Sequence, residues 1–297
     1  MLSFFESPIG CIHVSGKDSL DFFNRMSTND LAALPTGEYK KTVFTNDKGR
    51  IIDIVTLINW NDGMLMLTSP GYEDKIIEHL DKYIIMDDVA LTKQTGYGSL
   101  NFFGADVIQT VNNILNSGID TNNRISDIAG VTAYFDDFAF GKVILIGVKE
   151  KLSEIKQKFS EFQELSESEY NLFRIEHGFP VAPNEINEQI NPVECGLNKY
   201  ISYTKGCYIG QEVIARLDSQ GKIPKQMVKI SSDSAISPDD KIYTDEKETG
   251  FISSAAKEHE NEYKGLGFIR SVNLDFESDY ISRNENGETN IKISKAI

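Results

Sequence analysis

Alternating apolar and polar residues mark the first strands that the chain predicts. Residues 39–45 and 50–60 alternate on either side of Asn46-Asp47-Lys48-Gly49, whose residue types are typical of a hairpin turn. A second turn, Asn61-Asp62-Gly63, leads into another strand over residues 64–68. Together these segments predict an antiparallel sheet.

Apolar residues at helical spacing predict the helices. Leu20, Phe23 and Met26 follow Ser15-x-x-Asp18, which has the form of a capping box. The dipeptide Ser69-Pro70 is expected to begin a second helix. The same two kinds of pattern predict strands near 88–92, 97–102, 130–135 and 142–148, and helices near 107–115, 152–162 and 166–178.

The pattern changes near Lys222, where short strands broken by Ser, Asp and Gly begin. Such strands predict a small terminal β-barrel. They fall at 226–230, 241–243, 250–254, 266–270 and 290–294. The fold class is therefore expected to be α+β, with a domain boundary at residues 218–221.

Composition narrows the class of protein. The chain has 297 residues, of which 40% are apolar, as in globular proteins. Its formal charge of −15 repels phosphate backbones, so no direct nucleic-acid binding is expected. The longest apolar run, Val143 to Val148, is far shorter than the ~18 residues of a membrane span, and the N-terminus has no basic leader. These features predict a cytoplasmic protein without a membrane partner.

The cysteines and histidines show no metal-binding pattern. Three widely spaced cysteines, without a C-x-x-C pair, fit reduced thiols better than a disulfide framework or a zinc site. The four histidines form neither an H-E-x-x-H motif nor a short ligand pair. We therefore expect no metal centre built by this chain.

The segment from Lys205 to Arg216 carries the strongest candidate for chemistry. Two glycines bracket Cys207 just before an amphipathic run. A helix beginning near Gly210 would place the thiol beside its N-terminus, where free N–H groups and Lys205 favour the thiolate. The alternative is a small apolar cysteine that fills a turn. The flanking glycines make the two interpretations equally good.

Asp53 is the second candidate because it lies within a strand, on the same face as Ile51, Val55 and Leu57. An unpaired carboxylate there would be costly, so a ligand should compensate it, and its raised pKa would suit proton transfer. The alternative, which the sequence alone slightly favours, is that the Asp53 side chain lies on a solvent-exposed strand face or pairs with a residue of a neighbouring strand.

Arg174 and Glu176 end the helix that begins near Ser166. A glutamate in the last turn faces the negative end of the helix dipole, at a cost of ~0.3–1 kcal/mol, so its position needs a reason. The guanidine-like edge of a cyclic ligand would supply one. A solvent-facing glutamate beside Arg174 is the alternative.

These segments resemble a known family. The run Lys205-Gly206-Cys207-Tyr208-Ile209-Gly210-Gln211-Glu212 is similar to the signature of YgfZ-type proteins, the folate-binding relatives of the glycine-cleavage T-protein that support iron-sulfur proteins. Further similar segments follow in the family's order: 24–30, 46–51, 174–180, 191–194, 250–254 and 265–267. The resemblance covers essentially the whole chain.

The resemblance implies a T-protein-like ring of three subdomains around a tetrahydrofolate pocket. Residues 1–220 would form the folate-binding region, as two interleaved α+β subdomains, and residues 221–297 the C-terminal β-barrel. Glu176 corresponds by position to the carboxylate that binds the pterin edge in T-proteins. The resemblance also implies cofactor contacts from other residues, namely Arg174, Asp53, Lys205, Tyr208 and Arg216.

Two departures from the T-proteins favour the YgfZ branch. T-proteins carry an Asp-Asp pair where this chain has Asp53-Ile54, and they lack a thiol of the Cys207 type. The leading hypothesis is a tetrahydrofolate-binding accessory protein for iron-sulfur cluster assembly or repair, linked to tRNA modification through cluster enzymes. Its partners would be folate and iron-sulfur client or assembly proteins, with Cys207 as the functional thiol.

Two other functions remain open. One is a tetrahydrofolate-dependent aminomethyl or methyl transferase, in which Asp53 would be the acid or base. The other is a binding module or tRNA-modification partner, which the acidic charge makes the least favoured.

Overall fold

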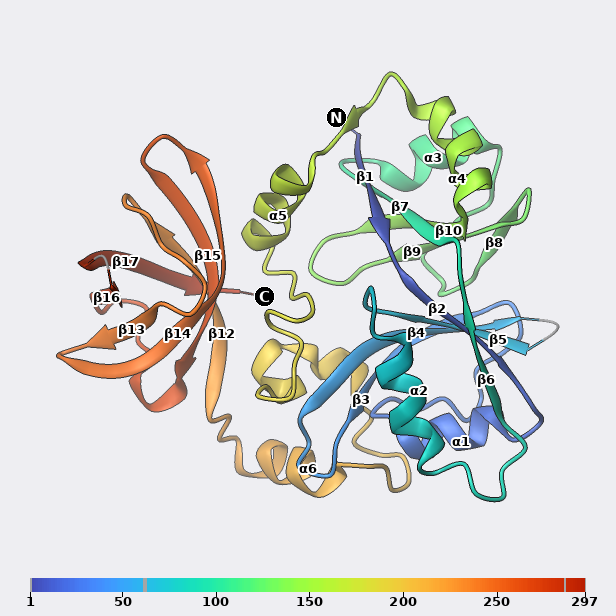
Figure 1. Cartoon of the computed structure of the whole chain (residues 1–297), viewed down its shortest axis with the longest axis horizontal. Helices are drawn as coiled ribbons and strands as arrows, with labels where there is room; N and C mark the ends of the chain where they lie inside the picture. The colour runs from blue at the N-terminus through green and yellow to red at the C-terminus, as the bar shows by residue number, and fades with distance from the viewer. Residues whose placement is uncertain (1, 61–62, 286, 297) are drawn as a thin grey trace. The chain divides into compact units, whose positions relative to one another are not determined.

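The computed structural model describes residues 2–60, 63–285 and 287–296 (Figure 1). The chain forms two compact units. The first contains Met1–Asn46, Ile52–Ser166 and Tyr200–Ile209, and the second contains Asp47–Ile51, Glu167–Lys199 and Gly210–Ile297. Of the predicted second turn, Asn61 and Asp62 lie outside the described residues.

A five-stranded sheet in the order β3-β4-β5-β2-β6 forms the first layer of unit 1. Its strands are β2 (Gly10–Ser15), β3 (Tyr39–Thr45), β4 (Ile51–Trp60), β5 (Gly63–Thr68) and β6 (Ala90–Gln94). Apolar faces of helices α1 (Ser19–Met26) and α2 (Glu73–Asp81) pack on it. Phe23 and Met26 of α1 are buried and Leu20 packs against the same core, so the predicted helical spacing marks the core-facing side of this helix.

A six-stranded sheet in the order β11-β1-β7-β10-β9-β8 forms the second layer of unit 1. Its strands are β1 (Ser3–Pro8), β7 (Tyr97–Phe103), β8 (Ser126–Ile128), β9 (Val131–Asp136), β10 (Lys142–Val148) and β11 (Gln163–Glu164). Helices α3 (Val107–Leu115) and α4 (Lys149–Lys156), with the short helix η1 (Gln157–Phe159), share its core. Residues of both sheets meet in a third core of unit 1 that includes Cys11, Tyr39 and Tyr134.

Unit 2 combines helices with a closed six-stranded barrel in the order β12-β15-β14-β13-β16-β17. The barrel strands are β12 (Lys225–Ser232), β13 (Lys241–Thr244), β14 (Lys247–His259), β15 (Glu262–Arg270), β16 (Tyr280–Asn284) and β17 (Gly287–Lys295). The helices are α5 (Glu167–Glu176), α6 (Gln211–Gln220), η2 (Pro192–Cys195), η3 (Leu197–Tyr200), which ends in unit 1, and η4 (Ser271–Asn273). The predicted α+β class and terminal barrel are confirmed.

Two helix starts differ from the prediction. Asp18 is the N-cap of α1 without a side-chain cap hydrogen bond, and Ser19 Oγ donates to the carbonyl of Gly16 at 2.7 Å, so the predicted capping box is wrong. Helix α2 begins at Glu73 rather than at Ser69-Pro70. Ser69 is instead held by Asp53, as described below. Within the described ranges, each helix is too short or too polar to cross a lipid bilayer.

Candidate functional site

Asp53 lies on β4 and is completely buried. Its Oδ2 accepts a hydrogen bond from Ser69 N at 2.8 Å, and its Oδ1 accepts bonds from Ser69 Oγ at 2.6 Å and Ile54 N at 2.9 Å. Burial raises the pKa of Asp53 to about 6, although these donors oppose the shift. The protein itself therefore compensates the carboxylate, and its proton can exchange close to neutral pH.

Lys205 anchors the segment that carries Cys207. Its Nζ donates to the carbonyls of Asn24 and Ser27 at 2.5 Å and to the carbonyl of Asn29 at 2.6 Å, where α1 ends and the following loop begins. A cation at a helix C-terminus is favoured by the helix dipole. Burial lowers the pKa of Lys205 to about 8. The ammonium thus joins the segment 200–209 to α1.

Cys207 itself is exposed between two anchored residues. On one side is Lys205, and on the other Thr45 Oγ1 donates to the carbonyl of Ile209 at 2.6 Å. Tyr208 is buried, the Lys205 Nζ lies 5.0 Å from its ring centroid, and burial raises its pKa to about 12. The chain therefore holds Cys207 in place while leaving its thiol accessible.

The other two cysteines are buried. Burial raises the pKa of Cys11 to about 12 and also raises that of Cys195. Cys195 Sγ also donates to the carbonyl of Glu185 at 3.4 Å. Because a thiol reacts as an accessible thiolate, only Cys207 among the three has access to a reagent or partner.

We expect a thiol titration to show this difference directly. In the native protein one cysteine should react with a thiol reagent such as dithionitrobenzoate, and after unfolding all three should react. The Cys207→Ser variant should lose the native reaction and keep two reactive thiols when unfolded. Native reaction of Cys11 or Cys195 would contradict the assignment.

Arg174 occupies a different setting, in unit 2. It is 3% exposed and donates from Nε to Asn171 Oδ1 at 2.9 Å and from Nη2 to Ser254 Oγ at 2.7 Å. Its Nη1 donates to Glu185 Oε2 at 3.2 Å and to the carbonyl of Phe179 at 3.3 Å. The guanidinium therefore ties α5 to barrel strand β14 and to the loop that follows the helix.

Glu185, the partner of Arg174, was not among the predicted site residues. It is fully buried, and its Oε1 accepts hydrogen bonds from the hydroxyls of Ser253 and Ser254, both at 2.6 Å. Its Oε2 also accepts a bond from Val181 N at 3.1 Å. No periodic pattern marks this loop, so only the long-range partners identify Glu185 as an organising residue.

Glu176 is exposed at the C-terminal end of α5 and lines a cavity of about 260 Å³. Lys229, Ser231, Lys264 and Ser294 contribute polar groups to the same cavity. Lys229 Nζ donates to the carbonyl of Glu176 at 3.3 Å. The ammonium groups of Lys229 and Lys264 offset the negative end of the helix dipole. A glutamate is therefore tolerated in the last turn of α5.

Helix α6 begins at Gln211 after Gly210, which has φ 83°, so the helix start predicted near Gly210 is confirmed. Arg216 lies on this helix with an exposed side chain. The predicted site residues thus fall into two groups. Asp53, Lys205, Cys207 and Tyr208 belong to unit 1, and Arg174, Glu176 and Arg216 belong to unit 2.

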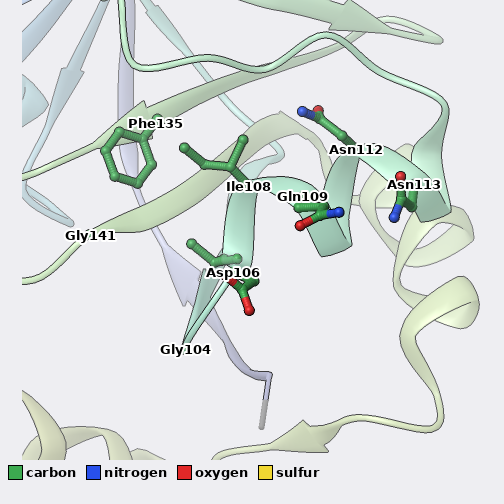
Figure 2. A pocket seen from close by; sticks show the side chains of 9 residues that line it. Gly104, Asp106, Ile108, Gln109, Asn112, Asn113, Phe135 and Gly141 are labelled. Atoms are coloured by element: carbon green, nitrogen blue, oxygen red, sulfur yellow. The ribbon is translucent and has the colours of Figure 1, made fainter.

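A larger hollow of about 700 Å³ lies beside α3 in unit 1 (Figure 2). Figure 2 shows Gln109, Asn112 and Asn113 projecting from the helix and Phe135 on the neighbouring strand. None of its nine lining residues is a predicted site residue. We therefore assign it no role in the candidate site.

One group among the described side chains has the spacing of metal ligands: Glu258, His259 and Glu262, on the hairpin of β14 and β15. Lys264 Nζ already lies 3.0 Å from Glu258 Oε2 and 3.6 Å from Glu262 Oε1. Because an ammonium compensates these carboxylates, we assign no metal to them.

Comparisons with known proteins agree with this architecture. The GCVT N-terminal domain family matches residues 5–131. A chloroplastic protein of Arabidopsis thaliana named as a transferase is 28% identical over 278 residues, which cover 89% of this chain and 64% of that protein. The tRNA-modifying protein YgfZ of Hamiltonella defensa is 24% identical over 301 residues, covering 94% of this chain and 86% of that protein.

A solved structure shows the fold. The glycine cleavage system aminomethyltransferase T from Bartonella henselae superimposes with a TM-score of 0.84 at 13% identity, covering 99% of this chain and 85% of that one. This structure shows that the chain has the fold of that aminomethyltransferase. Its sequence is similar to YgfZ proteins, which match between 76% and 95% of this chain at 23–25% identity.

Proposed function

We propose that this protein binds tetrahydrofolate and assists the assembly or repair of iron-sulfur clusters in client proteins of the cytoplasm. Its link to tRNA modification would then run through cluster-dependent enzymes that modify tRNA, consistent with the name of its YgfZ relatives. The observation that carries the proposal is Cys207, an exposed thiol in a segment anchored on both sides. Such a thiol is available to a partner protein or a cluster.

The folate part of the proposal rests on the polar cavity at Glu176. One carboxylate beside Lys229 and Lys264 fits a reduced pterin edge, which offers N–H donors next to a carbonyl acceptor. Glu176 would bind the N–H pair, and Lys229 would bind the carbonyl. When bound, the reduced folate supplies the capacity to carry a one-carbon unit.

Calorimetric titration with tetrahydrofolate tests whether the protein binds this cofactor. We expect the wild type to bind and Glu176→Ala to bind at least about tenfold more weakly, because a charge-assisted hydrogen bond is lost. Glu212→Ala, which removes an exposed glutamate from α6, is the matched control and should bind as the wild type does. A saturating ligand at 100 times its dissociation constant should also add about 2.7 kcal/mol to the free energy of unfolding. No binding by the wild type would refute the folate role.

The functional role of the Cys207 thiol can be tested in cells that lack the native protein. Cys207→Ser should fold normally, because the side chain is exposed, yet fail to restore the activity of cluster-dependent enzymes. Thr204→Ala, an exposed neighbour in the same segment, should restore that activity in full. Full restoration by Cys207→Ser would exclude a functional role for the thiol.

A second candidate function is favoured by Asp53. A buried carboxylate with a pKa of about 6 is suited to proton transfer in a tetrahydrofolate-dependent aminomethyl or methyl transferase. If the carboxylate acts as a base, turnover of a methylamine donor with tetrahydrofolate should rise as the pH increases through 6. Asp53→Asn should abolish turnover, whereas Asp74→Asn, at an exposed position, should not. Absence of turnover in the wild type would eliminate this candidate.

A further inference from the structure

Met86 lies in the loop that joins α2 to β6 in unit 1 (Figure 1). It is 93% exposed, and its neighbour Ile85 is 84% exposed. The other methionines that the structure describes are at most 7% exposed, namely Met26, Met64, Met66 and Met227. Among the described methionines, only the Met86 thioether is therefore open to a dissolved reagent.

Hydrogen bonds and an ion pair hold both ends of this loop. On the helix side, Tyr83 N donates to a carbonyl in the last turn of α2 at 2.9 Å. On the strand side, Arg25 Nη2 donates to Asp87 Oδ1 at 2.5 Å, and it forms an ion pair with this carboxylate. Next to it, Asp88 N donates to Asp18 Oδ2 at 2.8 Å. The exposure of the apolar pair between these anchors is therefore part of the fold and does not come from a frayed end.

The exposed pair contributes little to the stability of the fold. Ile84, the residue before it, packs against the core shared by the five-stranded sheet, α1 and α2. Ile85 and Met86 remain in water, so their side chains gain almost no free energy from burial in this chain. A polar group added to the Met86 side chain should therefore change the chemistry of the surface and leave the core intact.

We propose that Met86 is a site of oxidative modification by peroxides, which convert its side chain to methionine sulfoxide. A lone pair of the thioether sulfur forms a bond to one oxygen of hydrogen peroxide, and the O–O bond breaks. The other oxygen leaves as hydroxide and takes the proton of the transferred oxygen, so that water is released. The sulfur is oxidised and the peroxide is reduced. Methionine sulfoxide reductases can reverse such a modification.

The buried methionines are protected by the fold. Met64 and Met66 lie on β5, Met26 ends α1 and Met227 lies on β12, so a peroxide reaches their sulfur atoms only after the structure around them opens. Such opening costs free energy, which lowers the oxidation rate in proportion to the population of the open form. Met86 needs no such opening, so the fold itself selects the modified residue.

Mass spectrometry of tryptic peptides tests the assignment. Trypsin cleaves after Lys82 and Lys93, so residues 83–93 form a peptide whose only methionine is Met86. After the Cys207 thiol is blocked with N-ethylmaleimide, the folded protein is treated with hydrogen peroxide. We expect the peptide 83–93 to gain an oxygen atom at least about tenfold faster than the peptides that carry the buried methionines. In urea-unfolded protein the rates should become similar. Similar rates in the folded protein would overturn the proposal.

Stability measurements test whether the modification is confined to the surface. Wild-type protein oxidised only in the peptide 83–93 should keep its urea midpoint. Met86→Gln, which places a polar side chain of similar length at the same position, should keep it as well. Met66→Gln is the matched comparison, because it puts the same amide into the core and should lower the midpoint. A lower midpoint after oxidation of Met86 alone, or in Met86→Gln, would contradict a modification that leaves the core intact.

Discussion

Replacing Arg174 with methionine is expected to lower the free energy of unfolding by about 3 to 5 kcal/mol. The change leaves the carboxylate of Glu185 buried without its cation, and it removes hydrogen bonds to Asn171, Ser254 and the Phe179 carbonyl. Most of the cost comes from the uncompensated charge rather than from the lost attraction. Urea denaturation of the wild type and the variant at pH 7, followed by circular dichroism, would measure it.

Two companion variants identify the cause of the loss. The double variant Arg174→Met with Glu185→Leu removes both charges, so it should recover part of the lost stability. Arg216→Met removes an exposed arginine from α6 and should change stability by less than about 0.5 kcal/mol. Equal stability of the Arg174→Met and Arg216→Met variants would contradict a central role for the buried pair.

The sequence predicts elements well where periodicity is local. Five of the six barrel strands and the core faces of α1 and α2 follow from alternation and helical spacing, whereas barrel strand β16 (Tyr280–Asn284) was not predicted. Strands β1 and β2, each six residues long and only partly apolar, were not predicted. Their partners explain why: β1 pairs with β7 in one sheet and β2 with β5 and β6 in the other, so their role depends on residues far along the chain.

The chemistry of the site shows the same limit. A buried carboxylate at position 53 could be predicted from its strand neighbours, but its compensation by Ser69 could not, because the helix expected there begins later. The role of Lys205 was also hidden in the sequence. Its closeness to Cys207 along the chain suggested a cation for the thiol, whereas its ammonium is bound by carbonyls of residues 24–29.

Lys205→Met is expected to lower the free energy of unfolding by about 2 to 4 kcal/mol at pH 7, because hydrogen bonds from a charged group to three carbonyls are lost. The burial that lowers the pKa of Lys205 to about 8 also sets the pH dependence. An unfolded lysine titrates near pH ~10.4, so between pH 8 and 10 the unfolded chain holds a proton that the folded protein has released. Over this pH range the titration of Lys205 makes the wild type more stable as the pH rises. The difference in free energy of unfolding between the wild type and Lys205→Met therefore increases.

The same variant decides between anchoring and cofactor binding for Lys205. If its ammonium anchors the segment that carries Cys207, Lys205→Met will change both the unfolding free energy and the rate at which Cys207 reacts with a thiol reagent. If it only binds a cofactor, tetrahydrofolate affinity will fall while stability and thiol reactivity stay at the wild-type values. Lys40→Met is the control, because its single exposed bond to the Asp30 carbonyl should leave all three measurements nearly unchanged. The three carbonyls held by Lys205 favour anchoring, because a donor already shared among them has little capacity left for a ligand.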